Sequence, residues 1–438
     1  MKKTLFFIYL ILMAAAVGCK KDDDLSLDVE KSFKNPAESL ADFKKAIGGS
    51  ASGWKVLLSH HSGRIFSGFM SLDTTKKELQ LYMDFDGETA ATASKSAFKI
   101  DLLQNTAPTI TLEAGSHLDS LEDAGIDKDY SMRSVKGDTV SLVGARFADE
   151  IRLVKATAPE QAVFTSGGFA SQIGDIEAYL ESAVFLYAAL DNQSVAQLLI
   201  NPVDVNLTSA VLSSSKGVST ASSFYSYSAG GITMKSPIMA GDTKVTELGW
   251  DAAAGKLYFN YKGAKLFLEN SLVPVIGAEY LLGTAGYSLF SVPSPTLLAL
   301  PGWSAGFRTV WNTASAAITA RGFTLYVVEF NIDPVSSVMN MDVYFLRGST
   351  RYQARFPYSY SKSGEGVYKF TALPLEETTT GSNASFMSAQ LKPLTDLMST
   401  GSYKVQTYPL RGNTLILGQF VSVETPGIYF TGILDKLF

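Results

Sequence analysis

Cys19 has the most specific chemical setting in the sequence, because it is the only cysteine among the 438 residues and directly follows an apolar run. The run from Leu5 to Val17 begins after two lysines and leads into small residues. This pattern is typical of a secretory signal, and the run is shorter than the roughly 20 residues of a membrane-spanning helix. Small residues before a cysteine form a lipobox, where the thiol is acylated and the chain is cut. We therefore expect a signal peptide at residues 1–18 and lipidation of Cys19; the alternative is an ordinary signal peptide with an accidental cysteine.

Residues 19–34 are polar and are predicted to form a lipidated tether. Several acyl chains on one residue anchor a protein stably, where a single chain would be marginal. The tract Lys20-Lys21-Asp22-Asp23-Asp24 resembles the lysine-plus-acidic signal that sends lipoproteins of Bacteroidota to the outer face of the outer membrane. A solvated charged tether is the other interpretation. We expect a lipid-anchored protein of the outer membrane that faces the cell exterior.

Three histidines are the candidate metal ligands. His60 and His61 are adjacent in a predicted strand or at its end, so their side chains should point to opposite faces and cannot easily share one metal ion. His117 and Asp119 could add ligands only if the fold brought them near. A single cysteine excludes a disulfide framework and multi-cysteine metal sites. We therefore predict no metal site and no cofactor.

Asp84-Phe85-Asp86-Gly87-Glu88 places two carboxylates on one face of a strand end. Oxygen ligands at alternate positions suit calcium, but the spacing of an EF-hand loop is missing. Because Asp-Gly at a strand end is a common turn, we expect a turn here.

No sequence motif identifies a catalytic residue. Gly49-Ser50-Ala51-Ser52-Gly53 has the glycines of a nucleophile elbow, but alanine stands at the position of the nucleophile. The sequence also lacks the zinc-protease helix motif, the phosphate-binding loop and the dinucleotide fingerprint. Two carboxylates far apart in sequence could still form a glycosidase site without a local signature. An anchored hydrolase acting on polysaccharide or peptide therefore stays open as an alternative.

Two tyrosine pairs could bind flat ligands such as sugars by stacking. In Tyr225-Ser226-Tyr227 and Tyr358-Ser359-Tyr360, a strand would place both rings of a pair on one face. Arg355 lies near the second pair and could supply polar contacts. Tyr358, Tyr360 and Arg355 are thus the candidate ligand-binding residues, and the alternative is that the rings pack the sheet or its rim.

The elements that must position these residues are mostly strands. A helix is predicted from the N-cap Asn35 to Gly48-Gly49. Leu79, Leu81 and Met83 then alternate with polar residues, as in a strand with one buried face. Similar runs, separated by turn residues, predict an antiparallel meander that closes into a barrel or a curled sheet. These runs lie at 64–72, 96–103, 108–112, 130–135, 139–145 and 150–156.

The rest of the chain alternates between helices and strands. A helix with apolar positions from Ile176 to Leu190 precedes strands at 230–268. Residues 271–303 contain four prolines and predict a stiff connector or covering strap. A helix at 304–320, four strands, a helix near 384–398 and three final strands complete the prediction.

We therefore predict a mainly β fold with a few α-helices, made of antiparallel meanders that form lipocalin-like curled sheets or barrels. The expected units are an N-terminal β domain at 35–158, a middle β-rich region at 159–300 and a C-terminal α+β region at 301–438. Hydrophobic residues make up 46% of the chain, which excludes disorder as its main state. The net charge of −5 makes nucleic acid an unlikely partner.

Several segments together resemble the Bacteroidota lipoproteins catalogued as domain of unknown function 4302. The resemblance implies a lipid-anchored envelope protein, often encoded beside outer-membrane uptake receptors and their partner lipoproteins, and it carries over no catalytic residue. The segments are Gly53-Trp54-Lys55, Leu81–Asp86, Ile151–Thr157, Glu247–Trp250, Leu300–Trp303, Arg355–Tyr360, Gly366–Phe370, Leu391–Leu394 and Ile428–Gly432. We expect a non-enzymatic surface lipoprotein that binds a nutrient ligand or assists an outer-membrane uptake complex.

Overall fold

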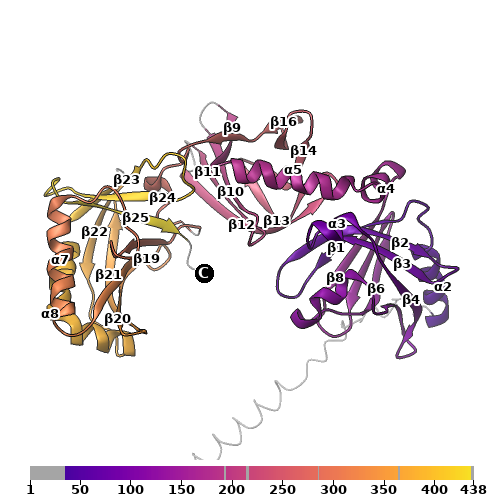
Figure 1. Cartoon of the computed structure of the whole chain (residues 1–438), viewed down its shortest axis with the longest axis horizontal. Coiled ribbons are helices and arrows are strands. Elements are labelled where there is room, and N and C mark those ends of the chain that lie inside the picture. The colour runs from indigo at the N-terminus through magenta and orange to yellow at the C-terminus, as the bar shows by residue number, and fades with distance from the viewer. Residues whose placement is uncertain (1–34, 192–193, 214–216, 285, 364–365, 436–438) are drawn as a thin grey trace, which may run out of the picture.

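A computed structural model describes residues 35–191, 194–213, 217–284, 286–363 and 366–435. Three β units follow one another along these residues and form an arch, with a closed barrel at each end and an open sheet between them (Figure 1). The predicted mainly β fold, with antiparallel meanders that close into barrels, is confirmed. The predicted signal peptide, Cys19 and the tether at 19–34 lie outside the described residues.

The first barrel closes because its first and last strands, β1 and β8, pair with each other in antiparallel fashion. Helix α2 (Pro36–Ile47) packs against β4 and β5, while α3 (Gly87–Ala91) and the 3-10 helix η1 (His117–Ala124) lie in connections between strands. The strands are β1 (Trp54–Ser59), β2 (Ile65–Asp73), β3 (Glu78–Met83), β4 (Ser94–Leu103), β5 (Ala107–Leu112), β6 (Asp129–Lys136), β7 (Thr139–Gly144) and β8 (Glu150–Lys155).

Helix α2 forms as its sequence predicts. The Asn35 side chain accepts a hydrogen bond from the Ala37 amide at 2.9 Å and so caps the first turn. Phe43 and Ile47 are buried against the barrel. The Trp54 indole donates to the Ile47 carbonyl oxygen at 3.1 Å, which fixes the end of the helix over the first strand.

A nine-stranded sheet, which we call the bridging sheet, joins the two barrels. Helices α4 (Ala158–Thr165) and α5 (Gly168–Ser182) precede it, and α5 runs along one face of the sheet (Figure 1). The predicted continuation of this helix to Leu190 is wrong, because β9 begins at Phe185. The strands are β9 (Phe185–Asp191), β10 (Ser194–Asn201), β11 (Asn206–Ser213), β12 (Gly217–Ser228), β13 (Gly231–Ala240), β14 (Thr243–Asp251), β15 (Lys256–Tyr261), β16 (Ala264–Phe267) and β17 (Glu269–Ser271).

Strand β2 of the first barrel packs against β12 of the bridging sheet. The two carboxylate oxygens of Asp84 accept hydrogen bonds from the backbone amides of Ser67 and Tyr227, each at 2.8 Å. The hydroxyls of Ser67 and Ser226 lie 2.6 Å apart and are buried. These bonds join residues far apart in the sequence and fasten the first barrel to the sheet.

The second barrel again has eight strands in sequence order, and β18 closes it by pairing with both β19 and β25. Helices α7 (Ala305–Thr319) and α8 (Thr379–Thr400) lie on the side away from the bridging sheet (Figure 1), and α6 (Ala278–Leu281) precedes the barrel. The strands are β18 (Leu289–Pro293), β19 (Thr324–Asp333), β20 (Val338–Arg347), β21 (Thr350–Lys362), β22 (Val367–Ala372), β23 (Ser402–Tyr408), β24 (Ile416–Ser422) and β25 (Tyr429–Asp435).

The prediction of a stiff connector or covering strap at residues 271–303 is wrong in part, because this segment contains α6 and the strand β18 that closes the barrel. Pro293 occupies the last position of β18, and Pro274, Pro295 and Pro301 lie outside the strand. The prolines therefore lie at the end of the strand or outside it, and they do not prevent the strand from forming.

Aromatic side chains fill the second barrel. The rings of Phe290 and Phe420 lie 4.6 Å apart between centroids, and Phe307 of α7 stacks on Phe430 at 4.3 Å. Phe185 of the bridging sheet belongs to the same buried cluster. The core of the second barrel thus continues into the bridging sheet. The first junction has an apolar part too, because Phe69 and Ala90 of the first barrel belong to the buried cluster under α5.

Candidate functional site

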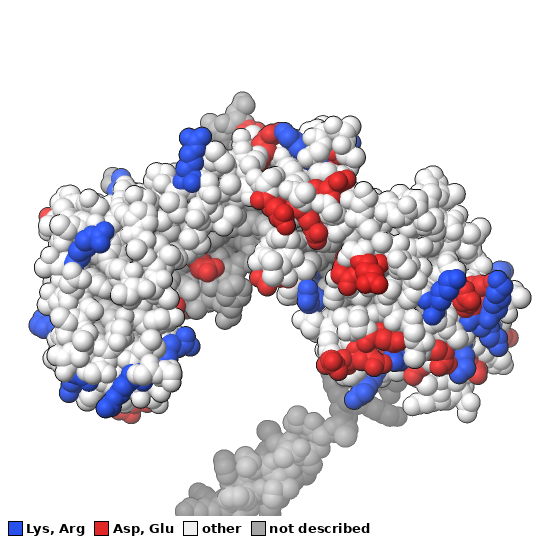
Figure 2. Space-filling model, viewed as in Figure 1, with Lys and Arg blue, Asp and Glu red and all other residues white. Residues whose placement is uncertain are grey.

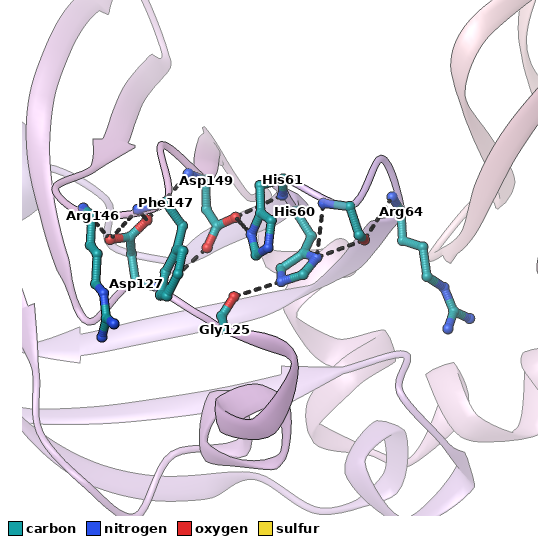
Figure 3. Close-up of polar contacts among 9 residues, drawn as sticks. His60, His61, Arg64, Gly125, Asp127, Arg146, Phe147 and Asp149 are labelled. Atoms are coloured by element: carbon teal, nitrogen blue, oxygen red, sulfur yellow. Dashed lines mark hydrogen bonds and ion pairs between the residues drawn. The ribbon is translucent and has the colours of Figure 1, made fainter.

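A cluster of histidines and carboxylates lies where three connections between strands of the first barrel meet (Figure 3). His60 and His61 follow the end of β1, and Asp149 precedes β8. Gly125 and Asp127 come from the segment between η1 and β6. One atom each of His60, His61 and Asp149 could bind a metal ion, and these atoms all lie within 4.8 Å of one another.

Asp149 organises the cluster, although its side chain has no exposed surface. Its Oδ1 accepts from the backbone amide of His61 at 2.8 Å and lies 3.0 Å from Nδ1 of the His61 ring. Its Oδ2 accepts from the Asp127 amide at 3.1 Å. A carboxylate at Nδ1 favours the tautomer that carries its proton there, so Nε2 of His61 is left with its lone pair.

His60 is buried, and both of its ring nitrogens have partners. Nε2 lies 2.8 Å from the Gly125 carbonyl oxygen, which can only accept, so this nitrogen carries the proton in the neutral ring. Nδ1 then accepts from the Ser62 hydroxyl at 2.7 Å and from the Ser62 amide at 3.3 Å. A serine hydroxyl that donates to an imidazole is the first contact that nucleophilic catalysis requires.

Asp127 supports the loop that carries Asp149. Its carboxylate accepts from the backbone amides of Arg146 at 2.6 Å and Phe147 at 3.0 Å. The side chain fits because Gly144 has no Cβ: an added Cβ would lie 1.9 Å from Oδ2 of Asp127. Phe147 in turn stacks on the His61 ring, with centroids 5.1 Å apart.

The expectation that His60 and His61 point to opposite faces is wrong. It holds for residues within a strand, but β1 ends at Ser59 and both histidines lie in the turn that follows. Their ring centroids are 4.0 Å apart. His117 lies elsewhere, with its Nε2 2.7 Å from the Thr92 carbonyl oxygen.

The structure gives the carboxylates of Asp84 and Asp86 separate roles. Asp84 holds the junction described above, while Asp86 accepts from the Thr89 amide at 2.8 Å and caps α3. This hydrogen bond is the main reason that the pKa of Asp86 lies below its usual value. The segment is therefore a turn followed by a helix cap, in agreement with the turn prediction.

The candidate ligand-binding residues of β21 lie on two faces of the strand. Tyr358 is only 1% exposed and points into the second barrel, and burial raises its pKa to about 12. Arg355, three residues earlier, points outward and binds both oxygens of Asp342, at 2.8 and 3.0 Å. Tyr360 is partly buried beside Tyr368, with centroids 5.8 Å apart. The structure does not bring Arg355 and Tyr358 together.

The other tyrosine pair is also in a core. Tyr225 and Tyr227 lie on one face of β12 as predicted, with centroids 5.7 Å apart, and both are buried against the α5 side of the bridging sheet.

Glu329 and Asp342 are direct neighbours on β19 and β20. Burial, and then the nearby Asp342 carboxylate, raise the pKa of Glu329. Two carboxylates with different environments are what a glycosidase needs. However, Asp342 is 1% exposed and is bound by Arg355 and by Asn331 at 2.7 Å. It is therefore closed to a substrate.

A hollow of about 540 Å³ lies where the bridging sheet meets the second barrel. Its apolar walls come from both units, with Leu198 and Ile200 on β10, Tyr287 beside the barrel and Ile416 on β24. Its charged lining residues are acidic: Glu181, Asp204 and Asp435. No pattern in the sequence predicts this hollow, because its lining residues come from separate parts of the chain, such as Leu198 and Ile416.

Within the described ranges, no helix is long and apolar enough to cross a membrane.

Comparisons with known proteins identify one family. No curated protein matches the sequence. The solved structures that resemble the chain include the beta subunit from DNA polymerase of Streptococcus pyogenes, at 10% identity over 92% of this chain and 99% of that chain, with a TM-score of 0.14. Another is the pol III beta of Caulobacter crescentus, at 11% identity over 91% and 98%, with a TM-score of 0.14. At these TM-scores the similarity assigns neither a fold nor a function. Residues 35–252 match the family model described as "Domain of unknown function (DUF4302)", so the chain belongs to this family, as its motifs predict.

Proposed function

We propose that this protein is a cell-surface lipoprotein that is anchored through Cys19 and binds a nutrient ligand, or assists an outer-membrane uptake complex, without catalysing a reaction. The observation that supports binding best is the hollow of about 540 Å³ between the bridging sheet and the second barrel. Its volume is in the range of small-molecule sites, and its walls are apolar with a few polar groups at defined places. The acidic rim suits a ligand with an apolar body and amine or hydroxyl donors.

The hollow is a better ligand site than the barrel interior. The space between Phe307, Phe430 and their neighbours in the second barrel amounts to only about 10 Å³, less than a ligand needs. The space-filling view shows an arch with a wide gap between the two barrels (Figure 2). A partner protein could therefore reach the bridging sheet between them.

A thermal-shift panel of nutrient-like small molecules tests ligand binding, because a ligand that binds the folded state raises the melting temperature. Ala183 lines the hollow and is only partly buried, so Ala183→Trp fills it from the edge. Ala253→Trp, in an exposed turn, is the matched control. We expect a compound that stabilises the wild type and the control but not Ala183→Trp. Equal stabilisation of all three proteins would contradict binding in the hollow.

Anchoring has its own test. Mass spectrometry of the protein extracted from membranes should find acyl chains on Cys19 at the N-terminus, and Cys19→Ala should release the protein into the soluble fraction. Protease added to intact cells should cut the wild-type chain if it faces the exterior. Recovery of an unmodified full-length chain would refute the anchor.

A second candidate function is hydrolysis, which the contact between the Ser62 hydroxyl and His60 favours. Catalysis by a triad needs one histidine between the serine and a carboxylate. Here the far nitrogen of His60 faces the Gly125 carbonyl, and Asp149 serves His61 instead. We therefore rank binding above hydrolysis. A fluorophosphonate probe that labels the wild type but not Ser62→Ala would reverse this order, with Ser120→Ala as the control.

A further inference from the structure

We propose that His60, His61 and Asp149 form a binding site for one divalent transition-metal ion, with zinc as the expected ion. Two imidazoles and a carboxylate are ligands that zinc commonly uses. Each residue offers one ligand atom, and the three atoms lie within 4.8 Å of one another. This inference concerns the first barrel and is independent of the hollow beside the second.

The ligands are already held in place by other contacts. Asp149 accepts two backbone hydrogen bonds, from His61 and Asp127, so its carboxylate cannot swing away. The His61 ring is fixed between Asp149 and the stacked ring of Phe147. Such supporting contacts orient metal-binding histidines in known sites. An ion would therefore bind a largely prepared site.

The His60 side also suits a cation. In the neutral ring, its Nε2 donates a hydrogen bond to the Gly125 carbonyl oxygen at 2.8 Å. When a metal ion binds Nε2, the ring proton moves to Nδ1, where the Ser62 hydroxyl changes from donor to acceptor. The ion then lies beside the Gly125 carbonyl oxygen, which can act as a further ligand. His60 therefore stays a neutral ligand and releases no proton, and its hydrogen bonds to the Gly125 carbonyl and the Ser62 amide are given up. At His61 the ion takes the place of the Nδ1 proton beside Asp149, and that proton moves to Nε2.

The site has a route to solvent. The His61 side chain is 36% exposed. A hollow of about 660 Å³ lies next to the cluster and is lined by Gly125, Asp127 and Phe147. The exposed part of His61 is where an ion can reach the cluster, and a water molecule can complete its coordination. Three protein ligands with one open position are the pattern of zinc sites that bind or activate a small molecule.

Zinc titration by isothermal calorimetry tests the proposal on the full chain, purified without a histidine tag and freed of metal with a chelator. All proteins carry Cys19→Ser, because a free thiolate would bind zinc. We expect one zinc ion per chain. His61→Ala and Asp149→Asn should each weaken binding by more than about tenfold, because each removes or neutralises one of the three proposed ligands. His117→Ala removes the remaining histidine of the chain and should change nothing.

Cobalt provides a second readout, because its visible absorption reports nitrogen and oxygen ligands directly. The spectrum of the wild type should lose its intensity in His61→Ala and keep it in His117→Ala. If the metal-free His61→Ala variant melts below the wild type, His61→Gln replaces it in both experiments. A wild type that binds no zinc, or a His61 variant that binds zinc as tightly as the wild type, overturns the proposal.

Discussion

Replacing Asp84 by asparagine tests whether a carboxylate at the first junction makes the stability of the arch depend on pH. Burial of the carboxyl raises the pKa of Asp84 to about 7 from 3.8, although the amides of Ser67 and Tyr227 act in the opposite direction by hydrogen bonding to its charged form. Between these two values the unfolded chain has lost a proton that the folded chain keeps. The free energy of unfolding must therefore fall as pH rises from about 4 to 7.

The size of this effect follows from the difference between the two pKa values. One pKa unit equals about 1.4 kcal/mol, so the range from 3.8 to about 7 sets an upper limit of about 4 kcal/mol. Asp84 keeps some contact with solvent, which screens part of the cost. We therefore expect about 2 kcal/mol of the free energy of unfolding to be lost between pH 5 and pH 8 because of this one group.

The assay is urea unfolding of the wild type and Asp84→Asn at several pH values from 5 to 8. The asparagine side chain cannot accept hydrogen bonds from the amides of both Ser67 and Tyr227. The missing hydrogen bond therefore lowers the free energy of unfolding of the variant by about 1–3 kcal/mol at every pH. Other titrating groups cancel in the difference between the two proteins. The stability advantage of the wild type should shrink by about 2 kcal/mol as pH rises.

Asp86→Asn is the matched control, because it makes the same chemical change two residues away. Asparagine is as good a helix cap as aspartate, and the pKa of Asp86 is lowered, so its titration lies below this pH range. Its difference from the wild type should stay constant from pH 5 to 8. Parallel curves for the wild type and Asp84→Asn would show that the junction does not bury a titrating carboxyl.

Three further substitutions have expected effects on urea unfolding at pH 7. Gly144→Ala should destabilise the protein by about 1–3 kcal/mol, because the new Cβ overlaps the Asp127 carboxylate. Phe430→Ala should cost about 3–5 kcal/mol, because it empties the centre of the second barrel. Arg355→Met should cost about 2 kcal/mol by leaving the buried Asp342 carboxylate without its cation, which is below the range for a fully buried pair because a third of Arg355 is exposed.

Each of these substitutions has a matched control, which is the same amino-acid change at a position where the contact is absent. An alanine at Gly87 would have no atom within 4 Å of its Cβ, Phe386 is 56% exposed, and Arg351 lies on the exposed part of β21. The corresponding substitutions at these positions should change stability by less than about 1 kcal/mol. If a control costs as much as its partner, the contact named for that partner does not explain the loss.

Most strands of the first barrel could be predicted because they have one apolar face. In β3, Leu79, Leu81 and Met83 are buried and the residues between them are partly exposed, so the period of two is visible in the sequence. The same reasoning failed at β9. There Phe185 joins the core of the second barrel and Leu186 joins the core under α5, so both faces are covered. From Leu186 onward the buried positions of β9 alternate, but the more exposed Tyr187 and Ala189 are also hydrophobic. The sequence therefore shows one continuous apolar run, and the helix prediction extends into it.

The geometry of the candidate residues differs from the prediction in two places, for two different reasons. The separation of Arg355 from Tyr358 could have been predicted, because residues three apart in a strand point to opposite faces. The meeting of His60, His61 and Asp149 could not. It depends on where β1 ends and on how the turn before β8 folds, and both are set by hydrogen bonds of Asp149 and Asp127 to backbone amides. No periodic pattern records such bonds.

Three carboxylates of the two barrels, Asp84, Asp342 and Asp149, differ in the partners that bind their oxygens, and this difference decides which of them can take part in chemistry. Both oxygens of Asp84 are taken by backbone amides, so its role ends with the junction. Asp342 is closed on all sides by Arg355 and an asparagine. Asp149 is as deeply buried, but one of its partners is the ring of His61, and the His61 side chain is 36% exposed. A buried carboxylate gains a function only through a partner that can itself bind something else, and among these three only Asp149 has one.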